Sequence, residues 1–311
     1  MLEDKRELIK IAHYYYKDGL TQQEIAQKLS ISRQKVNRSI KRLHEEGIVK
    51  IEIMKLEDSF EELESALEKK FNLRRVIVAH ADSKEDITRQ LGVAGAEFLM
   101  SQLNDDVKIG VSWGKTLHEV GANLRNGQKG NVEVIQLVGG VNSNIAADMT
   151  NEITRQFASS LGGVPHYIYA PAIVKSRELK ESILQEDSIR VVMEEIDHCD
   201  IAFVGIGELS SVSTIYEQKY LDSDYLNYLH GNNAVGDICL HVFDKTGNFI
   251  EENVEHFSIG LDRAQLLNIP NVVAIAGGAE KVNAIIGALR TGAVDVLITD
   301  SITAHMISSE I

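Results

Sequence analysis

A run of basic and amide side chains between residues 33 and 43 has the chemistry needed to read DNA. At helical spacing these side chains share one face: Arg33, Gln34, Asn37, Arg38 and Lys41. Arg, Gln and Asn can make bidentate hydrogen bonds to base edges in the major groove, and Lys can bind phosphates. Val36, Ile40 and Leu43 lie on the opposite face and are expected to pack inward. A basic amphipathic helix alone is more often a solvated surface, so the flanking sequence decides between the two interpretations.

Capping residues divide the flanking sequence into a helix-turn-helix. Thr21 and Glu24 form a capping box before a short helix, and Ser32 caps the basic helix after a turn. An earlier helix from Asp4 to Gly19 is expected to turn Leu8, Ala12, Tyr15 and Tyr16 inward. The residues Val49, Ile51 and Ile53 alternate with Lys50 and Glu52, as in the strand of a wing. The sequence therefore predicts a winged helix-turn-helix domain at residues 1–54. Thr21, Gln22 and Ser32 are expected to contact DNA together with the basic face.

A glycine-rich segment at residues 110–116, GVSWGKT, has the chemistry to hold an anion. It follows an apolar strand-like run and opens a helix, and residues 116–119 read as a second capping box. Free helix-start amides, the Ser112 and Thr116 hydroxyls and the Lys115 ammonium would suit a sugar phosphate. A nucleotide P-loop needs four residues between its first Gly and the Gly-Lys-Thr, whereas this segment has three, so an ATPase is not expected. A plain strand-to-helix turn remains the alternative.

Eight apolar runs supply the elements that would position this segment. They lie at residues 75–80, 107–113, 132–138, 166–170, 200–206, 237–243, 271–276 and 294–300. Helix-length amphipathic stretches separate most of them, which predicts an α/β fold with a doubly wound, mostly parallel sheet covered on both faces. Ligands of such sheets bind at the carboxyl ends of the strands. Several residues at those ends would surround one crevice, although each alone is more often part of a turn: Gly139, Gly140, Glu208 and Lys281. Asp237, at the start of a strand, could bind sugar hydroxyls or cap a turn.

Charge is distributed unevenly along the 311 residues, whose formal net charge is −14. Residues 1–53 contain eleven Lys/Arg and eight Asp/Glu, a net of +3, so the remaining chain carries −17. An acidic body repels phosphates, so DNA contacts must come from the basic head. Cys199 and Cys239 have no paired spacing, which fits the reducing cytoplasm. The amino terminus lacks a secretory pattern and no run approaches the ~18 apolar residues of a membrane span.

The segment between head and body reads as a connecting helix. Phe60, Leu63 and Leu67 form its apolar stripe. The stripe is either a dimer seam or a contact with the chain's own body, and too few heptads are present for a coiled coil. The sequence therefore predicts a linker helix at residues 55–72 and an effector-binding and oligomerisation domain at residues 73–311.

Across essentially its whole length, the chain resembles the SorC family of sugar-responsive bacterial regulators. The resemblance is carried, in order, by GLTQQEIAQKLSISRQKVNRSIKRLHEEGIVKIEI, KIGVSWGKTL, VIQLVGGV, AVGDICLHVFDKTGN and VVAIAGGAEKVNAIIGALRTGAVDVLITD. It implies a body similar to phosphosugar isomerases that acts as a sensor, a homotetramer, and operator binding that changes when a phosphorylated sugar or polyol binds.

The resemblance also assigns roles to residues of the glycine-rich segment and the strand ends. It implies that the effector phosphate is held by Gly110, Ser112, Gly114, Lys115 and Thr116, with Trp113 inside the same segment. Asp237 would meet the sugar and Lys281 would lie at the edge of the site. A deoxyribonucleoside-responsive branch has a Schiff-base lysine where this chain has Val138, so non-covalent recognition is expected.

Two classes of function are thus compared. A regulator binds operator double-stranded DNA and a phosphorylated effector, whereas a sugar-phosphate isomerase or deaminase with an accessory head would need an acid/base pair in the crevice. Asp237 and Glu208 are the candidates for such a pair, but their separation in sequence leaves their proximity open. We expect the regulator, with no catalytic residue, cofactor, metal site or membrane partner.

Overall fold

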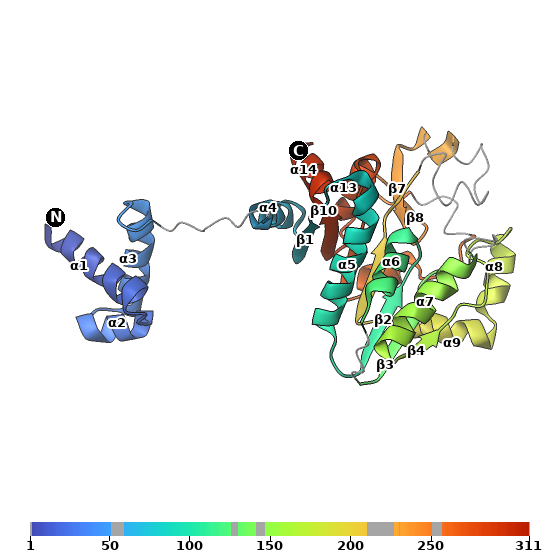
Figure 1. The fold of residues 1–311 in the computed structure, drawn as a ribbon, viewed down its shortest axis with the longest axis horizontal. Coiled ribbons are helices and arrows are strands. Elements are labelled where there is room, and N and C mark those ends of the chain that lie inside the picture. Colours follow the sequence, from blue (N-terminus) through green and yellow to red (C-terminus); the bar gives the residue numbers. More distant parts are fainter. Residues whose placement is uncertain are drawn as a thin grey trace. The chain divides into compact units, whose positions relative to one another are not determined.

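The chain forms two compact units, residues 1–59 and 60–311, and each has its own apolar core. The computed structural model describes residues 2–50, 59–125, 130–140, 147–209, 227–229, 231–250 and 257–310 (Figure 1). Within those residues no helix is long and apolar enough to cross a membrane.

The first unit is a bundle of short helices with the predicted caps. Its elements are α1 (Leu2–Ala12), the π-helix η1 (His13–Lys17), α2 (Gln22–Leu29) and α3 (Arg33–Glu45). Thr21 and Glu24 form the capping box in both directions, and Ser32 Oγ accepts from the Lys35 amide. Side chains from α1, α2 and α3 share one core: Leu8, Ile11, Ile25, Ala26, Val36, Ile40 and Leu43. The helix-turn-helix therefore has the predicted order.

The inner stripe predicted for the first helix is partly wrong. Ile11 is buried completely, whereas Tyr16 is 38% exposed and its hydroxyl hydrogen-bonds His44 Nε2 at 2.7 Å. The π-helical turn at His13–Lys17 is the physical reason, because its wider turn rotates Tyr16 away from the α-helical stripe, while Tyr15 stays packed against the core. The predicted wing strand lies mostly outside the described residues, since Ile51 and Ile53 are among those not described.

A seven-stranded parallel sheet forms the centre of the second unit. The strands run in the order β1-β10-β9-β5-β2-β3-β4, and every pairing between them is parallel. Their bounds are β1 Arg75–Ala79, β2 Val107–Val111, β3 Val132–Gln136, β4 Val164–His166, β5 Ile201–Gly205, β9 Val272–Ile275 and β10 Val296–Asp300. A small antiparallel sheet consists of β6 (Gly207–Glu208), β7 (Ala234–Ile238) and β8 (His241–Asp244).

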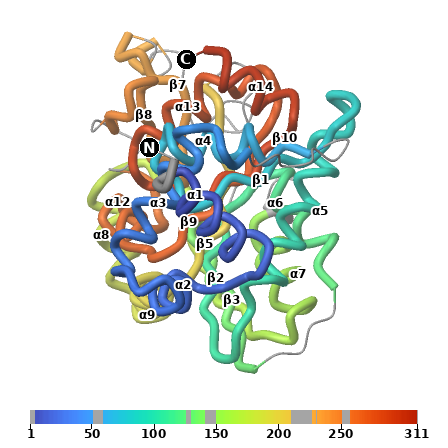
Figure 2. The backbone as a smooth tube through the Cα atoms, turned by 90° about the vertical axis from the view of Figure 1, so that its left-hand side faces the viewer, coloured from blue at the N-terminus to red at the C-terminus, as the bar shows by residue number. Residues whose placement is uncertain are grey.

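Helices cover both faces of the parallel sheet, as Figures 1 and 2 show. The core of one face includes side chains from α5 (Lys84–Gln102), α6 (Lys115–Asn123) and α7 (Ala147–Leu161). The core of the other face includes side chains from α4 (Glu61–Phe71), α9 (Asp187–Ile196), α12 (Arg263–Asn268), α13 (Val282–Arg290) and α14 (Ser301–Ser309). The same strand serves both cores, because Val134 belongs to the first and Ile135 to the second. The predicted doubly wound architecture is confirmed.

The connecting helix α4 packs on its own body. Leu67 is 1% exposed within the body core, and Phe60 and Leu63 pack against that core. Two carboxylates of α4 also cover the outer edge of β1: Glu64 Oε1 accepts from the Val78 amide at 2.8 Å, and Glu68 Oε1 from the Val76 amide at 2.9 Å. The contact with the body, one of the two alternatives open from sequence, is therefore formed.

Two predicted strands differ from those observed. The run at residues 237–243 is a hairpin, because Cys239 and Leu240 form its turn with φ angles of 51° and 71°. Cys and Leu rarely adopt such angles, so the sequence carries no turn signal there. The strand predicted at residues 166–170 is observed at Val164–His166, because the chain beyond it leaves β3 and Pro171 pairs instead with Gly140.

Candidate functional site

The outer face of α3 carries the side chains predicted to read DNA. All five are exposed: Arg33, Gln34, Asn37, Arg38 and Lys41. Two other basic residues of α3 are engaged within the head, since Lys35 lies 2.6 Å from Glu7 and Arg42 lies 2.7 Å from Glu46. Arg33, Arg38 and Lys41 have no acidic partner within the described part of the head. Three cations and two amides are thus available to an outside ligand on one helical face.

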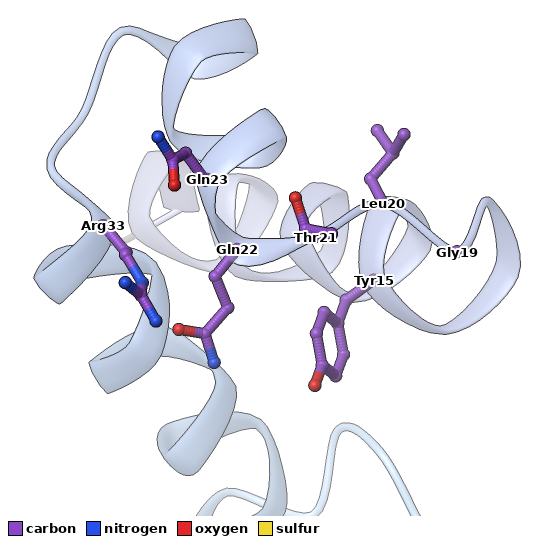
Figure 3. Close-up of a pocket in the computed structure, with 7 residues that line it drawn as sticks. All are labelled: Tyr15, Gly19, Leu20, Thr21, Gln22, Gln23 and Arg33. Atoms are coloured by element: carbon purple, nitrogen blue, oxygen red, sulfur yellow. The ribbon is translucent and has the colours of Figure 1, made fainter.

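A hollow of about 590 Å³ lies beside this face, at the start of α2. It is lined by Tyr15, Gly19, Leu20, Thr21, Gln22, Gln23 and Arg33. Figure 3 shows the side chains of Tyr15, Gln22 and Arg33 directed to the same side of the two helix starts. The Thr21 hydroxyl donates to Glu24 Oε2 at 2.7 Å, so Thr21 first serves the helix cap. Sequence reasoning missed Tyr15 as a lining residue, because it predicted that the ring would turn inward.

In the body, the strand order reverses between β2 and β5. The chain proceeds from β2 through β3 to the β4 edge, and then returns to β5 on the other side of β2. The segments after β2 and β5 are joined there, because the Ser112 amide donates to the Phe203 carbonyl at 3.0 Å and Ser112 Oγ accepts from the Gly205 amide at 3.3 Å. Such a reversal is where open α/β sheets bind ligands. Ser112 itself is 1% exposed, so its hydroxyl is buried beneath the point where the strand order reverses.

The helix after β2 begins one residue before the predicted cap. Gly114 is the N-cap of α6, with φ of 124° and no side-chain cap, and the His118 amide donates to its carbonyl. The predicted capping box at residues 116–119 is therefore wrong, because Thr116 already lies inside the first turn. The amides of Lys115, Thr116 and Leu117 precede the first intrahelical bond, which is the arrangement that favours an anion. Lys115 is exposed and Trp113 is partly exposed beside it.

Asp237 and Lys281 lie together near the ends of β5 and β9. Asp237 is 3% exposed; its Oδ2 accepts from the Leu240 amide at 3.0 Å, while its Oδ1 has no hydrogen-bond partner among the described residues. Lys281 Nζ donates to the Ile206 carbonyl at 2.9 Å. Burial raises the pKa of the Asp237 carboxyl and lowers the pKa of the Lys281 ammonium, and their mutual attraction opposes both shifts. Glu208 and Lys115 are also close enough to act on the charge of Lys281.

Three glycines predicted for the site have packing roles in the structure. A Cβ on Gly110, inside β2, would lie 2.7 Å from Leu137, and one on Gly139 would lie 2.7 Å from the Ala170 carbonyl oxygen. Gly140 exchanges backbone hydrogen bonds with Ala170 and Ala172. These glycines allow neighbouring segments to approach closely beside the crevice. Their contact with an effector stays a prediction.

The sequence reasoning missed two residues that shape the crevice. Asp300, completely buried at the end of β10, accepts from the Gly278 amide at 3.2 Å and the Thr303 hydroxyl at 2.6 Å, and so holds the turn that leads to Lys281. Gly207 is needed because a Cβ there would lie 2.1 Å from Asp237 Oδ1. A buried strand that ends in Asp was the available signal for Asp300. The glycine-containing strand end at residues 205–208 was the available signal for Gly207, but its contact with Asp237 depends on a side chain thirty positions away in the chain.

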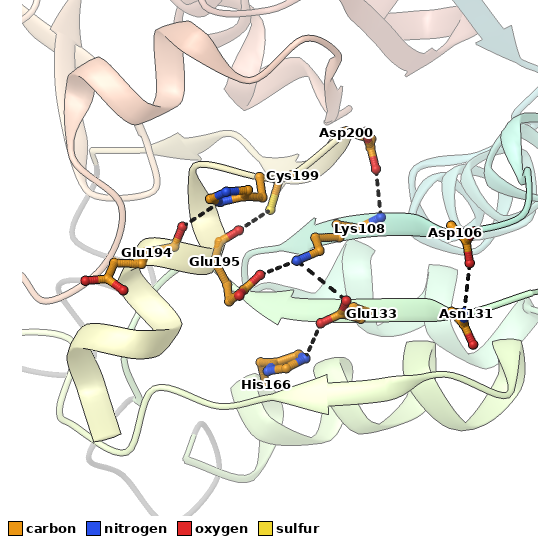
Figure 4. Close-up of polar contacts among 10 residues, drawn as sticks. Asp106, Lys108, Asn131, Glu133, His166, Glu194, Glu195, Cys199 and Asp200 are labelled. Carbon is orange, nitrogen blue, oxygen red and sulfur yellow. Dashed lines mark hydrogen bonds and ion pairs between the residues drawn. The ribbon is translucent and has the colours of Figure 1, made fainter. Parts of the chain in front are cut away.

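Another polar cluster lies away from the crevice, under α9 (Figure 4). Lys108 of β2 pairs with Glu195 of α9 and lies 3.5 Å from Glu133 of β3, whose carboxylate is 2.8 Å from His166 Nε2. Lys108 and Glu133 are the second residues of their strands, so this cluster belongs to the amino ends of β2 and β3. It ties α9 to the sheet and is separate from the ligand end.

The family models agree with this division into a reader and a ligand domain. A model described as "Putative sugar-binding domain" matches residues 56–308, and one described as winged helix-turn-helix DNA-binding matches residues 12–50. The full-length structure of the sorbitol operon regulator SorC from Klebsiella pneumoniae superposes with a TM-score of 0.76, at 28% identity, and covers 98% of both chains. The chain belongs to the SorC family. It is a DNA-binding transcriptional regulator.

Other regulators are similar to this chain over most or all of its length. The deoxyribonucleoside regulator of Bacillus subtilis (strain 168) is 30% identical over 100% of both chains. The transcriptional regulator LsrR of Escherichia coli (strain K12) is 30% identical over 98% of this chain and 95% of its own. A DeoR family regulator from Listeria monocytogenes superposes on 79% of this chain and 98% of its own, with a TM-score of 0.73 and 31% identity.

Proposed function

We propose that this regulator controls a carbohydrate or polyol catabolic operon in the cytoplasm and that a phosphorylated sugar or polyol changes its operator affinity. The main support for this proposal is the set of polar groups found where the strand order reverses, between β2 and β5. There, the free amides at the start of α6 follow β2, and the charges of Lys115 and of Asp237, whose Oδ1 is unpaired, both act on Lys281. Amides and ammonium groups suit a phosphate, and a carboxylate oxygen suits a hydroxyl donor.

The names of the relatives support a sugar-related effector. One relative is named for a sorbitol operon and another for deoxyribonucleosides. Val138, 1% exposed, stands where the resemblance places a Schiff-base lysine in the deoxyribonucleoside-responsive branch. We therefore propose reversible, non-covalent recognition, and a homotetramer as the functional assembly.

The effector proposal is tested by thermal unfolding of the full chain with a panel of sugar phosphates and polyol phosphates, each beside its unphosphorylated counterpart. A ligand that binds only the folded protein raises its Tm. We expect a phosphorylated compound to raise Tm and change Trp113 fluorescence, and Lys115→Ala to weaken that binding. Lys69→Ala, an exposed lysine on α4, is the matched control. Equal binding of the phosphorylated and unphosphorylated forms would contradict the proposed phosphate site.

For the head, we propose that Gln22, Arg33, Gln34, Asn37, Arg38 and Lys41 contact operator DNA. Thr21 and Ser32 act mainly through the helix caps that orient them. Arg33→Ala combined with Arg38→Ala should abolish operator binding, since each base contact is worth about 1–3 kcal/mol. Arg42→Ala, on the same helix but paired with Glu46, should have little effect. Sequence-specific binding that survives the double substitution would defeat the assignment.

A further inference from the structure

The two edges of the parallel sheet end differently. At β1 the outer amides of Val76 and Val78 donate to carboxylates of α4. At β4, the last strand in the order, the described residues place no strand on the outer side (Figure 4). An uncovered edge is a place where another chain can attach, unless the protein prevents it.

Large apolar side chains are exposed around the β4 edge. Val164 is 59% exposed and Tyr169 is 75% exposed, and the Tyr167 ring lies 5.8 Å from that of Tyr169. Val164 and Tyr169 are two of the eight exposed large hydrophobic side chains among the described residues. Tyrosines together with aliphatic side chains are typical of the centre of protein interfaces.

The stretch of chain around Val164 and Tyr169 carries no formal charge. Residues 156–174 contain no Lys, Arg, Asp or Glu, in a chain of which 25% is charged. The nearest charges before it, Glu152 and Arg155, neutralise each other through a hydrogen bond of 2.7 Å. Two copies of an acidic body repel each other, but a two-fold interface places each patch against itself. The charges beside the patch are paired with one another, as Glu133 is with His166 of β4 at 2.8 Å, which suits such self-contact. A basic partner would instead be attracted to the acidic surface elsewhere.

The chemistry of β4 also limits how a partner can attach. The strand has three residues, and the middle one is Pro165, which has no amide to donate. A short edge strand with a proline does not accept an added strand. Contact must therefore come from side chains packing against side chains, not from extension of the sheet.

We propose that the β4-edge surface, comprising Val164, Tyr167 and Tyr169, is the contact between two copies of this chain. The inference rests on the proposed self-association and names the surface that produces it. The occupant is a second copy because the patch is apolar and its stretch of chain carries no formal charge in an otherwise acidic body.

Sedimentation equilibrium of the full chain tests this surface. We expect the wild type to be a dimer or larger, and Val164→Asp with Tyr169→Asp to raise the dissociation constant roughly tenfold or more, because it buries charge in the contact. Both positions are exposed, so the fold should be retained, and Tyr169→Ser provides a milder variant. Met306→Asp, at a 36% exposed residue of α14, is the matched control.

Each result of that measurement decides the question. Dissociation of the double variant, with the control unchanged, supports the surface. An oligomeric wild type with an equally oligomeric double variant overturns the surface and leaves self-association intact. A wild type that stays monomeric at tens of micromolar overturns both. Operator binding of the wild type, measured on the same preparation, reports separately on the proposed function.

Discussion

The two oxygens of the Asp237 carboxylate have different surroundings. Oδ2 closes the β7–β8 turn by accepting from the Leu240 amide, whereas Oδ1 is buried without a partner among the described residues. A buried acceptor without a donor is unfavourable, and a ligand hydroxyl can relieve that cost. Asp237 can therefore be both a turn residue and an effector contact, the two interpretations that the sequence left open.

Gly207→Ala should separate these two roles. The new Cβ would lie 2.1 Å from Asp237 Oδ1 and displace the carboxylate. We expect a loss of about 1–3 kcal/mol in the stability of the body and a loss of the effector-induced rise in Tm. Operator affinity of the free protein should change little, since the head is a separate unit.

Gly231→Ala is the control for this substitution, because a Cβ there has no atom within 4 Å. Thermal unfolding with and without effector, and operator titration, are the measurements. An unchanged effector response in Gly207→Ala would show that the position of Asp237 Oδ1 is unimportant for recognition.

At the scale of elements, side chains of α4 take the place of a neighbouring strand at the outer edge of β1. Glu64 and Glu68 supply the acceptors that a neighbouring strand would offer to Val78 and Val76. Burial, and secondarily the charges of Glu61 and Glu68, raise the pKa of Glu64, although the Val78 hydrogen bond opposes the shift. One of the two carboxylates that fix α4 to the sheet, Glu64, therefore has a raised pKa.

Glu64→Gln should stabilise the body near neutral pH. A raised pKa means that the folded state holds the Glu64 proton more tightly than the unfolded chain does. The resulting stability is present below the ordinary carboxyl range and is lost as pH rises through the raised pKa. Glutamine can still accept from the Val78 amide but carries no buried charge.

The expected rise in Tm is a few degrees at most, because Glu64 is only half-buried, and it should shrink as the pH falls toward about 4. Thermal unfolding of both proteins between acidic and neutral pH provides the measurement. A variant less stable than the wild type at neutral pH would mean that the charged hydrogen bond outweighs burial.

Local signals in the sequence predicted the elements that depend on neighbouring residues. The Thr21–Glu24 box and the Ser32 cap mark real helix starts, and alternating apolar runs mark the parallel strands. Contacts between distant residues left no such signal. The carboxylates of α4 on β1 depend on two elements meeting in space, and the β7–β8 turn uses residues that do not normally favour it. The site followed the same rule: its strand ends were predictable, but the partners of Asp237 and Lys281 were not.

At the scale of the whole molecule, a head of charge +3 is joined to a body of charge −17. The body repels DNA, so one head must act against an unfavourable field. Holding two heads together makes the second contact intramolecular, which can raise affinity by about 10²–10⁴ without a new contact. Self-association of the bodies therefore offsets, in DNA affinity, the repulsion between the acidic body and DNA.

The salt dependence of operator binding should reveal the number of heads engaged. The logarithm of the binding constant falls with the logarithm of salt concentration by about 0.9 per phosphate neutralised. If Val164→Asp with Tyr169→Asp separates the copies, each complex engages half as many cations from Arg33, Arg38 and Lys41. We expect the variant's slope to be about half that of the wild type, together with a much weaker affinity. Met306→Asp should keep both values. A dissociated variant that retained the wild-type slope would show that one head supplies all the phosphate contacts, and that the bodies set affinity by some means other than joining heads.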